Sequence, residues 1–197
     1  MEERRERGVS ESLERVAVFI EWPNIEMAFR ALGCSVDPAA LRAYLTEGRW
    51  ETETFIYLGV DPRQPQTREP LIRSLRSEGF LVRTKRARVN GDGSLKCDFD
   101  VALALDAWDF AREVHPSVIV IASGDRDYVP LVERLRLQGI RVEIAATPDA
   151  MSHELLEAAN DFVDLTQMEE EPPLTSEELE PEGLAQEASE PEAENAQ

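Results

Sequence analysis

The chain has 197 residues, 42% of them hydrophobic, and a formal net charge of −19 at pH 7. That length suggests one domain with short appendages, and the apolar content is enough for a sizeable core. Two cysteines and two histidines are too few for a disulfide framework or a histidine-rich zinc site. No apolar run approaches the roughly 20 residues that a membrane span requires, and residues 1–15 lack the apolar stretch of an export signal. We therefore expect a cytoplasmic protein with no membrane partner.

The negative charge is concentrated at one end of the chain. Residues 169–197 contain eleven Glu, no Lys or Arg and no aromatic residue, which leaves the first 168 residues at a net −8. So acidic a segment, poor in large apolar side chains, cannot offset the entropy lost on ordering. We predict a charged N-terminal extension over 1–15, one domain over 16–166, and a disordered acidic tail over 167–197.

Strands and helices alternate along the predicted domain. The continuous apolar run 16–20 is typical of a central strand covered on both faces, and helical spacing follows over 24–32. Asp37 and Pro38 suit the cap and first turn of a second helix, which continues to residue 45. The remaining predicted elements are a strand at 52–60, a helix at 69–78, a strand at 80–82, a hairpin at 84–96, a helix at 98–114, a strand at 118–122, a helix at 127–138, a strand at 140–145, a helix at 151–158 and a short strand at 162–163. This order predicts an α/β fold, a three-layer α/β/α sandwich around a doubly wound, mainly parallel sheet.

Acidic side chains follow the predicted strands 16–20 and 118–122. Glu21 follows the first strand, and Ser123-Gly124-Asp125-Arg126-Asp127 comes directly after the strand 118–122. Ligands of open α/β sheets bind at the carboxyl ends of the strands. Asp125 and Asp127 would repel a phosphate directly, but they suit a divalent cation that then meets the phosphate. Capping of the following helix is the alternative role for Asp125.

Three acids of the predicted helix 98–114 are further candidates: Asp98, Asp100 and Asp106. Asp98 and Asp100 are about 200° apart around a helix, so both cannot face one ion if both are helical. Asp106 is about 240° from Asp100 and two turns along. Asp98 suits an N-cap, and Asp100 either complements the helix dipole or joins the acids at the strand ends.

Three segments carry a resemblance to a known family. They are Val18-Phe19-Ile20-Glu21-Trp22-Pro23-Asn24, Lys96-Cys97-Asp98-Phe99-Asp100-Val101-Ala102-Leu103-Ala104-Leu105-Asp106, and Ser123-Gly124-Asp125-Arg126-Asp127-Tyr128 with Leu131 and Gly139. Over roughly Val16–Leu165 the chain resembles the NYN domain, and more narrowly its LabA-like (DUF88) branch, which is related to PIN-domain nucleases. The resemblance implies a PIN-like fold whose acidic cluster binds Mg2+ or Mn2+ and cleaves RNA.

The resemblance also implies roles for single residues. Glu21, Asp100, Asp125 and Asp127 would be catalytic, and the first three of them would bind the metal. Asn24 matches as well, and Asp106 matches a recurrent acid of the helix. The family usually has aspartate where this chain has Glu21, whose extra methylene shifts the carboxylate oxygens by about 1 Å or more, a scale that matters for the strict octahedral geometry of Mg2+.

A basic segment precedes the acidic helix. Residues 63–96 hold nine Lys and Arg against three acids, a net +6, and phosphate contacts need such a patch, although a solvated surface is the simpler alternative. The predicted substrate-binding residues are Asn24, Ser123, Arg83, Lys85, Arg86, Arg88 and Lys96. Asn24 has helix capping as its alternative role, and Ser123 has the turn. Among the aromatic residues, Trp22 is the better candidate to stack on a base, while Tyr57 and Trp108 are expected in the core.

The leading hypothesis is a metal-dependent ribonuclease acting on single-stranded or structured RNA. A non-catalytic or attenuated RNA-binding regulatory module is the alternative, and Glu21 motivates it. A phosphatase is less favoured because no Asp-x-Asp follows the first strand, and no Gly-x-Gly-x-x-Gly indicates a dinucleotide enzyme. Neither His115 nor His153 lies near a nucleophile elbow, which argues against a serine hydrolase. A homo-oligomer is compatible with these features.

Overall fold

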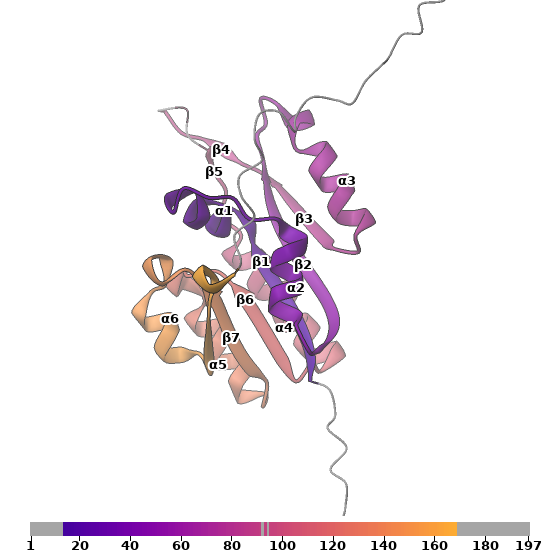
Figure 1. Ribbon diagram of the computed structural model, residues 1–197, viewed down its shortest axis with the longest axis vertical. Helices are drawn as coiled ribbons and strands as arrows, with labels where there is room; N and C mark the ends of the chain where they lie inside the picture. The colour runs from indigo at the N-terminus through magenta and orange to yellow at the C-terminus, as the bar shows by residue number, and fades with distance from the viewer. Residues whose placement is uncertain (1–13, 92, 94, 169–197) are drawn as a thin grey trace, which may run out of the picture.

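Six parallel strands form the central sheet of the computed structural model, which describes residues 14–91, 93 and 95–168 (Figure 1). Their spatial order is β3 (Leu81–Arg86), β2 (Trp50–Val60), β1 (Arg15–Glu21), β6 (Val118–Ala122), β7 (Arg141–Ala146) and β8 (Asp161–Asp164). Each neighbouring pair runs parallel, which confirms the predicted α/β class and the doubly wound sheet. Apart from residues 14–15 and 167–168, the predicted N-terminal extension and acidic tail lie outside the described residues.

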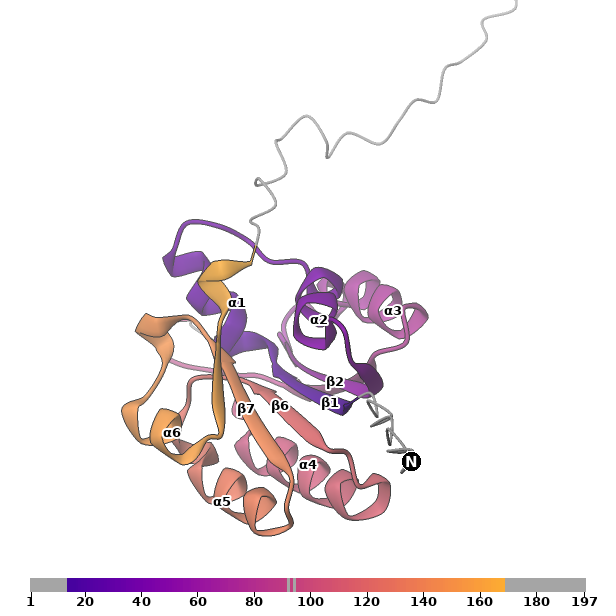
Figure 2. The ribbon, with the colours of Figure 1, turned by 60° about the horizontal axis from the view of Figure 1, so that its bottom comes forward.

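Helices cover both faces of this sheet (Figure 2). One face carries α1 (Trp22–Ala31), α2 (Pro38–Thr46) and α3 (Glu69–Ser77), and the other carries α4 (Asp100–Val114), α5 (Val129–Leu137) and α6 (His153–Ala158). Successive side chains of β1 point to opposite faces, so Val18 packs towards α1–α3 and Phe19 towards α4–α6. Because both faces are covered, the strand is a continuous apolar run, as its sequence predicted.

Short elements complete the described chain. A small antiparallel pair consists of β4 (Arg88–Val89) and β5 (Leu95–Lys96), and the single turns are η1 (Pro65–Thr67), η2 (Arg126–Tyr128), η3 (Pro148–Ala150) and η4 (Leu165–Gln167). No helix in the described part of the chain is both long enough and apolar enough to span a bilayer.

Some predicted boundaries were wrong, each for a local reason. The chain over 81–86 pairs with β2 instead of entering the hairpin, which is reduced to β4 and β5. The helix predicted from residue 98 begins at Asp100, and the Asp98 carboxylate accepts a hydrogen bond from the backbone N–H of Asp100 at 3.2 Å. The helix predicted from Asp127 is preceded by η2, and α5 begins at Val129, where Pro130 fits the first helical turn.

The centre of the sheet contains a topological switch point. Strands after β1 are added on one side as β2 and β3, and the chain then crosses to the other side of β1 for β6, β7 and β8. Such a reversal leaves a crevice at the carboxyl ends of the two central strands. Ile20 pairs with Ala122, so the residues that follow, Glu21 and Ser123, meet at this crevice although they are 102 residues apart.

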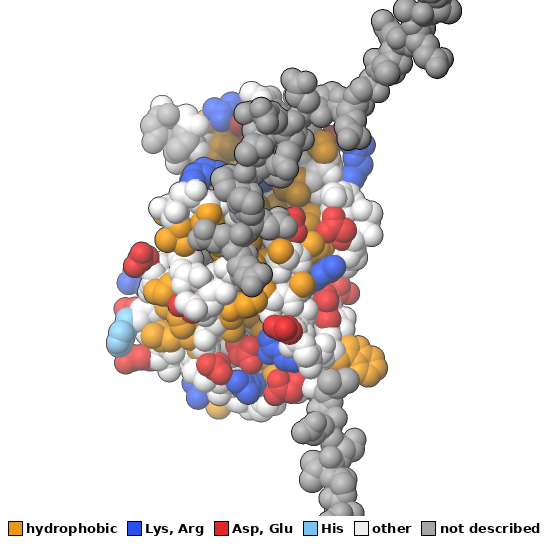
Figure 3. Space-filling view, in the orientation of Figure 1, with side chains coloured by type: hydrophobic (Ala, Val, Ile, Leu, Met, Phe, Trp, Pro, Cys, Tyr) orange, Lys and Arg blue, Asp and Glu red, His pale blue; other side chains and the backbone are white. Residues whose placement is uncertain are grey.

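The opposite, amino edge of the sheet has mixed charge. Arg141 pairs with Glu143 and Asp161, and Arg49 pairs with Glu143 at 2.8 Å. Figure 3 accordingly shows acidic and basic side chains interspersed along the lower border of the molecule. Since neither sign dominates among the described residues of this edge, they do not form the cationic field that attracts nucleic acid.

Candidate metal centre

Three carboxylates converge at the crevice. Oxygens of Asp100, Asp125 and Asp127 all lie within 4.8 Å of one another, and we call this group the carboxylate triad. Asp100 comes from the first turn of α4, whereas Asp125 and Asp127 come from the turn after β6. Carboxylates held this close repel one another unless a cation lies between them, and hard oxygen ligands suit Mg2+ or Mn2+.

The turn after β6 is held from several directions. The Asp125 carboxylate accepts a hydrogen bond from the backbone N–H of Asp127 at 3.0 Å, which caps η2. The backbone N–H of Gly124 donates to the side-chain oxygen of Asn24 at 3.3 Å, so Asn24 ties the turn to α1 instead of capping that helix. Asn24 therefore positions the turn that carries Asp125.

Gly124 allows a close approach of two backbone segments. A Cβ atom on Gly124 would lie 1.9 Å from the carbonyl oxygen of Ala150, at the end of η3. The Gly124 carbonyl also accepts a hydrogen bond from the backbone N–H of Ser152 at 3.0 Å. Only glycine fits this position, a requirement that depends on packing across the fold and that the sequence analysis missed.

Glu21 lies beneath the triad, with only 7% of its surface exposed. The buried hydroxyl of Ser123 donates a hydrogen bond to its carboxylate at 2.7 Å and accepts one from the backbone N–H of Asp125 at 3.2 Å. Burial raises the pKa of Glu21 to about 7, against the opposing effect of the Ser123 hydrogen bond. Glu21 is not part of the group within 4.8 Å, and Ser123 serves Glu21 and the turn.

Burial and neighbouring negative charge raise the pKa of two more groups, Asp100 and Tyr128. Burial and the neighbouring carboxylate of Asp98 raise the pKa of Asp100 to about 6, and Asp125 adds to this effect. The Tyr128 side chain is fully buried, and burial, together with the neighbouring carboxylates of Glu21 and Asp100, raises the pKa of its hydroxyl. Tyr128 follows Asp127 directly, and its sequence position alone did not distinguish a core role from a role at the site.

A cationic cavity adjoins the triad. This basic cleft has a volume of about 270 Å3 and is lined by Lys85, Arg86, Arg88, Lys96, Cys97 and Asp98. The Lys85 ammonium donates to the Asp98 carbonyl at 2.7 Å, two residues before Asp100. Four of the five predicted basic residues thus line one cavity next to the acidic site.

The fifth basic residue, Arg83, has a different environment. Its guanidinium pairs with Asp106 at 2.9 Å, and Asp106 also accepts a hydrogen bond from the Tyr57 hydroxyl at 2.9 Å. These contacts hold α4 against β2 and β3. Arg83 does not line the basic cleft, and Asp106 is not part of the triad.

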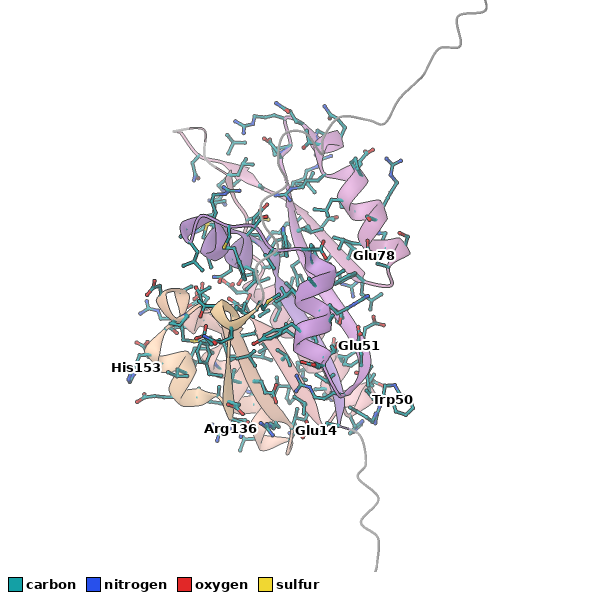
Figure 4. All side chains as sticks on the ribbon, viewed as in Figure 1. Glu14, Trp50, Glu51, Glu78, Arg136 and His153 are labelled. Carbon is teal, nitrogen blue, oxygen red and sulfur yellow. The ribbon has the colours of Figure 1, made fainter. Side chains whose placement is uncertain are left out.

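The aromatic residues divide differently from the prediction. Trp22 is 5% exposed and packs in the core with Ile25 and Phe29, so the idea that it stacks on a base was wrong. Tyr57 is in the core as predicted. Trp108 is only half-buried, and Trp50, 64% exposed, begins β2 at the amino edge of the sheet (Figure 4).

Comparison with known proteins shows the family to which this chain belongs. The model of the NYN domain matches residues 15–168. The chain belongs to the NYN domain family. Members of this family are generally nucleases that bind nucleic acid and typically use divalent metals.

Two individual proteins are similar to this NYN domain. "Low amplitude and bright protein LabA" of Synechococcus elongatus is 27% identical over 160 residues, which cover 77% of this chain and 83% of LabA. The crystal structure of a protein of unknown function from Vibrio parahaemolyticus superposes with a TM-score of 0.66 at 27% identity, over 82% of this chain and 98% of that one. The similarity to the Vibrio protein supports the fold and says nothing about activity.

The stability of this NYN domain without metal should fall as the pH rises from about 4.5 to about 7. Because the folded pKa of Glu21 is raised from 4.5 to about 7, unfolding releases a proton in this window, and higher pH favours the unfolded chain. The shift corresponds to at most about 3 kcal/mol. Glu21→Gln keeps an acceptor for Ser123 and should flatten the decline, as measured by urea denaturation in EDTA at pH 5 and pH 8.

The exposed Glu113→Gln variant is the matched control and should follow the wild type. Equal pH dependence in the wild type and Glu21→Gln would show that Glu21 ionises freely in the folded protein.

Proposed function

We propose that this protein is a metal-dependent ribonuclease that hydrolyses RNA phosphodiester bonds at the carboxylate triad. The observation that carries the proposal is the convergence of Asp100, Asp125 and Asp127 within 4.8 Å at the switch point of the sheet. The general nuclease character of the NYN family agrees with it. RNA is the proposed substrate, and Mg2+ or Mn2+ is the proposed cofactor.

The donor set fits a hard divalent cation. Carboxylate oxygens are the ligands that Mg2+ and Mn2+ prefer, and three of them converge here. Burial, followed by the charges of Asp98 and Asp125, raises the pKa of Asp100, and a bound cation would oppose this effect. A bound ion would supply Lewis-acid stabilisation of the phosphate and lower the pKa of a water molecule. The triad residues would hold the ion, and the ionised form of Glu21 would add charge from beneath.

The basic cleft supplies what the triad lacks. An RNA strand is repelled by uncompensated carboxylates, so its phosphates need cationic partners close to the cut. Lys85, Arg86, Arg88 and Lys96 are gathered beside Asp98, at the entrance to α4. They would bind the backbone and fix its register over the triad without reading its sequence.

Cleavage of RNA tests this function directly. The full-length protein is incubated with a mixed pool of end-labelled single-stranded and hairpin RNAs, in Mg2+, in Mn2+ and in EDTA. We expect fragments with one or both ions and none in EDTA. A pure preparation that cleaves no RNA with either ion would contradict the proposal.

The position of Glu21 favours a second candidate, an attenuated or non-catalytic RNA-binding module. Its carboxylate is engaged with Ser123 beneath the triad, outside the group of close oxygens, so the fourth carboxylate is partly withdrawn. If turnover is attenuated for this reason, Glu21→Asp should change the cleavage rate strongly. A severalfold gain over the wild type in Mn2+ identifies an attenuated nuclease, whereas RNA binding that persists in EDTA with no cleavage by either protein identifies a binding module.

A further inference from the structure

A groove between α4 and α5 opens next to the carboxylate triad. It has a volume of about 280 Å3, and its walls include Leu105, Trp108, Asp127, Pro130, Leu131 and Arg134. Asp127 belongs both to this α4–α5 groove and to the triad, so the two sites are continuous. The volume is just below the range of ordinary small-molecule pockets, which suits a single planar ring.

The helix beside the groove exposes apolar side chains. Val101 is 72% exposed and Leu105 is 58% exposed, and the two lie one turn apart on α4. Trp108 continues the same stripe towards the groove and is only half-buried. Adjoining exposed apolar residues beside a polar site are typical of a binding surface.

Trp108 and Arg134 offer a cationic, aromatic lining. The Arg134 guanidinium lies 5.8 Å from the centroid of the Trp108 ring, whereas Arg42 approaches the Phe80 ring to 4.4 Å. The Trp108 pair is therefore looser than a close stack, and Arg134 is exposed and able to move. Aromatic faces and arginine together are the groups on which single-stranded nucleic acids stack their bases.

The groove and the basic cleft flank the triad on opposite sides of α4. The basic cleft adjoins through Asp98, on the side where Asp106 of α4 meets Arg83 of β3. The groove adjoins through Asp127, on the side where α4 meets α5. A strand whose phosphates follow the cleft and cross the triad therefore continues into the groove.

We propose that the α4–α5 groove is a nucleobase subsite, in which one unpaired base of the RNA stacks on Trp108 next to the phosphate to be cut. This inference rests on the proposed ribonuclease function and adds to it a preference for single-stranded RNA. A base must leave its helix to enter the groove, so the site selects single-stranded RNA over paired RNA. Phosphates are bound in the cleft irrespective of sequence, and the base is bound in the groove.

Binding of RNA that lacks one base tests the subsite. Fluorescein-labelled single-stranded 12-mers, one intact and the others with one abasic position each, are titrated with full-length protein in EDTA, and Kd is read from anisotropy. We expect one abasic position to weaken wild-type binding by roughly tenfold. Trp108→Leu keeps an apolar side chain at the half-buried position and should bind intact RNA about tenfold more weakly than the wild type. Its Kd for intact RNA and for RNA with that abasic position should then be equal.

Three control variants separate stacking from other effects. Trp108→Phe keeps a ring and should restore most of the binding, and Trp50→Ala at the amino edge should leave Kd unchanged. Arg86→Ala in the basic cleft should weaken intact and abasic RNA equally and reduce the salt dependence of Kd, because it removes a phosphate contact. Thermal melting of each variant reports whether it folds. Leu105→Ser, at a largely exposed position, provides a second test if Trp108→Leu is unstable, and it should weaken intact RNA more than abasic RNA.

The outcomes distinguish the subsite from the nuclease. The subsite is wrong if folded Trp108→Leu binds intact RNA with the same Kd as the wild type. It is also wrong if no abasic position weakens binding by the wild type. Metal-dependent cleavage is unaffected by either result. A protein that neither binds nor cleaves RNA overturns both. If Leu105→Ser instead changes the oligomeric state on gel filtration and leaves Kd unchanged, the apolar stripe is an interface between copies of this chain, and the subsite is wrong.

Discussion

Asp125→Asn is expected to reduce metal-dependent RNA cleavage by at least about 100-fold and to leave the fold intact. Loss of a group that merely orients a metal ligand typically costs 10- to 100-fold, and Asp125 itself belongs to the triad. Asparagine keeps the side-chain oxygen that caps Asp127 at 3.0 Å, so the turn after β6 should survive. The substitution also removes one source of repulsion on Asp100 and should lower the pKa of that residue.

Three measurements accompany this variant. Cleavage is followed in Mn2+ and Mg2+, Mn2+ affinity by isothermal titration calorimetry, and stability by thermal melting in EDTA. Asp109→Asn changes an exposed acid on the same helix, α4, outside the triad, and should retain wild-type cleavage. Undiminished cleavage by Asp125→Asn would place the reaction elsewhere in the molecule.

Gly124→Ala is expected to lower stability by about 1–3 kcal/mol or more and to impair the site at the same time. The new methyl group would lie 1.9 Å from the Ala150 carbonyl oxygen and 3.1 Å from the Met151 nitrogen, and neither backbone atom can rotate away. The turn after β6 must therefore separate from η3, which strains the hydrogen bond between Ser152 and Gly124. In a protein of this size, such a loss corresponds to roughly 2–12 °C in Tm.

The same movement displaces Asp125, which follows Gly124 directly. A shift of about 1 Å at a reacting centre can cost roughly 100-fold in rate, so the Gly124→Ala protein should cleave poorly even well below its Tm. Gly91→Ala is the matched control, because a Cβ at Gly91 meets no atom within 4 Å. A Gly124→Ala protein with wild-type Tm and activity would mean that the two segments separate without cost.

For Asn24, the sequence motif selected the residue, but only the fold determined its contact. The motif that ends the first strand was sufficient to select Asn24, but capping of its own helix was the open alternative. In the structure its side chain reaches a turn 100 residues away and holds the backbone N–H of Gly124. A local pattern does not report such a contact, because it depends on β1 and β6 being neighbours in the sheet.

Local patterns determined the order of strands and helices, the α/β class and the positions of acids after β1 and β6. These features depend on side-chain periodicity and on turn residues within a few positions of one another, which a single sequence displays directly. The errors at the start of α4 and α5 are also local. The hydrogen bond from Asp100 to Asp98 and the turn η2 before Pro130 each accompany a boundary shifted by two residues, and neither changes the element.

Only the tertiary structure determined which charged side chains lie close together. It brings Asp127 together with Asp100 and Asp125, sets Glu21 beneath them against Ser123, and draws Arg83 away to Asp106. Each of these outcomes depends on strand register and on packing between segments distant in the chain. The physical reason is that burial and the distance between charges set the pKa and the reach of a carboxylate, and both are properties of the folded chain.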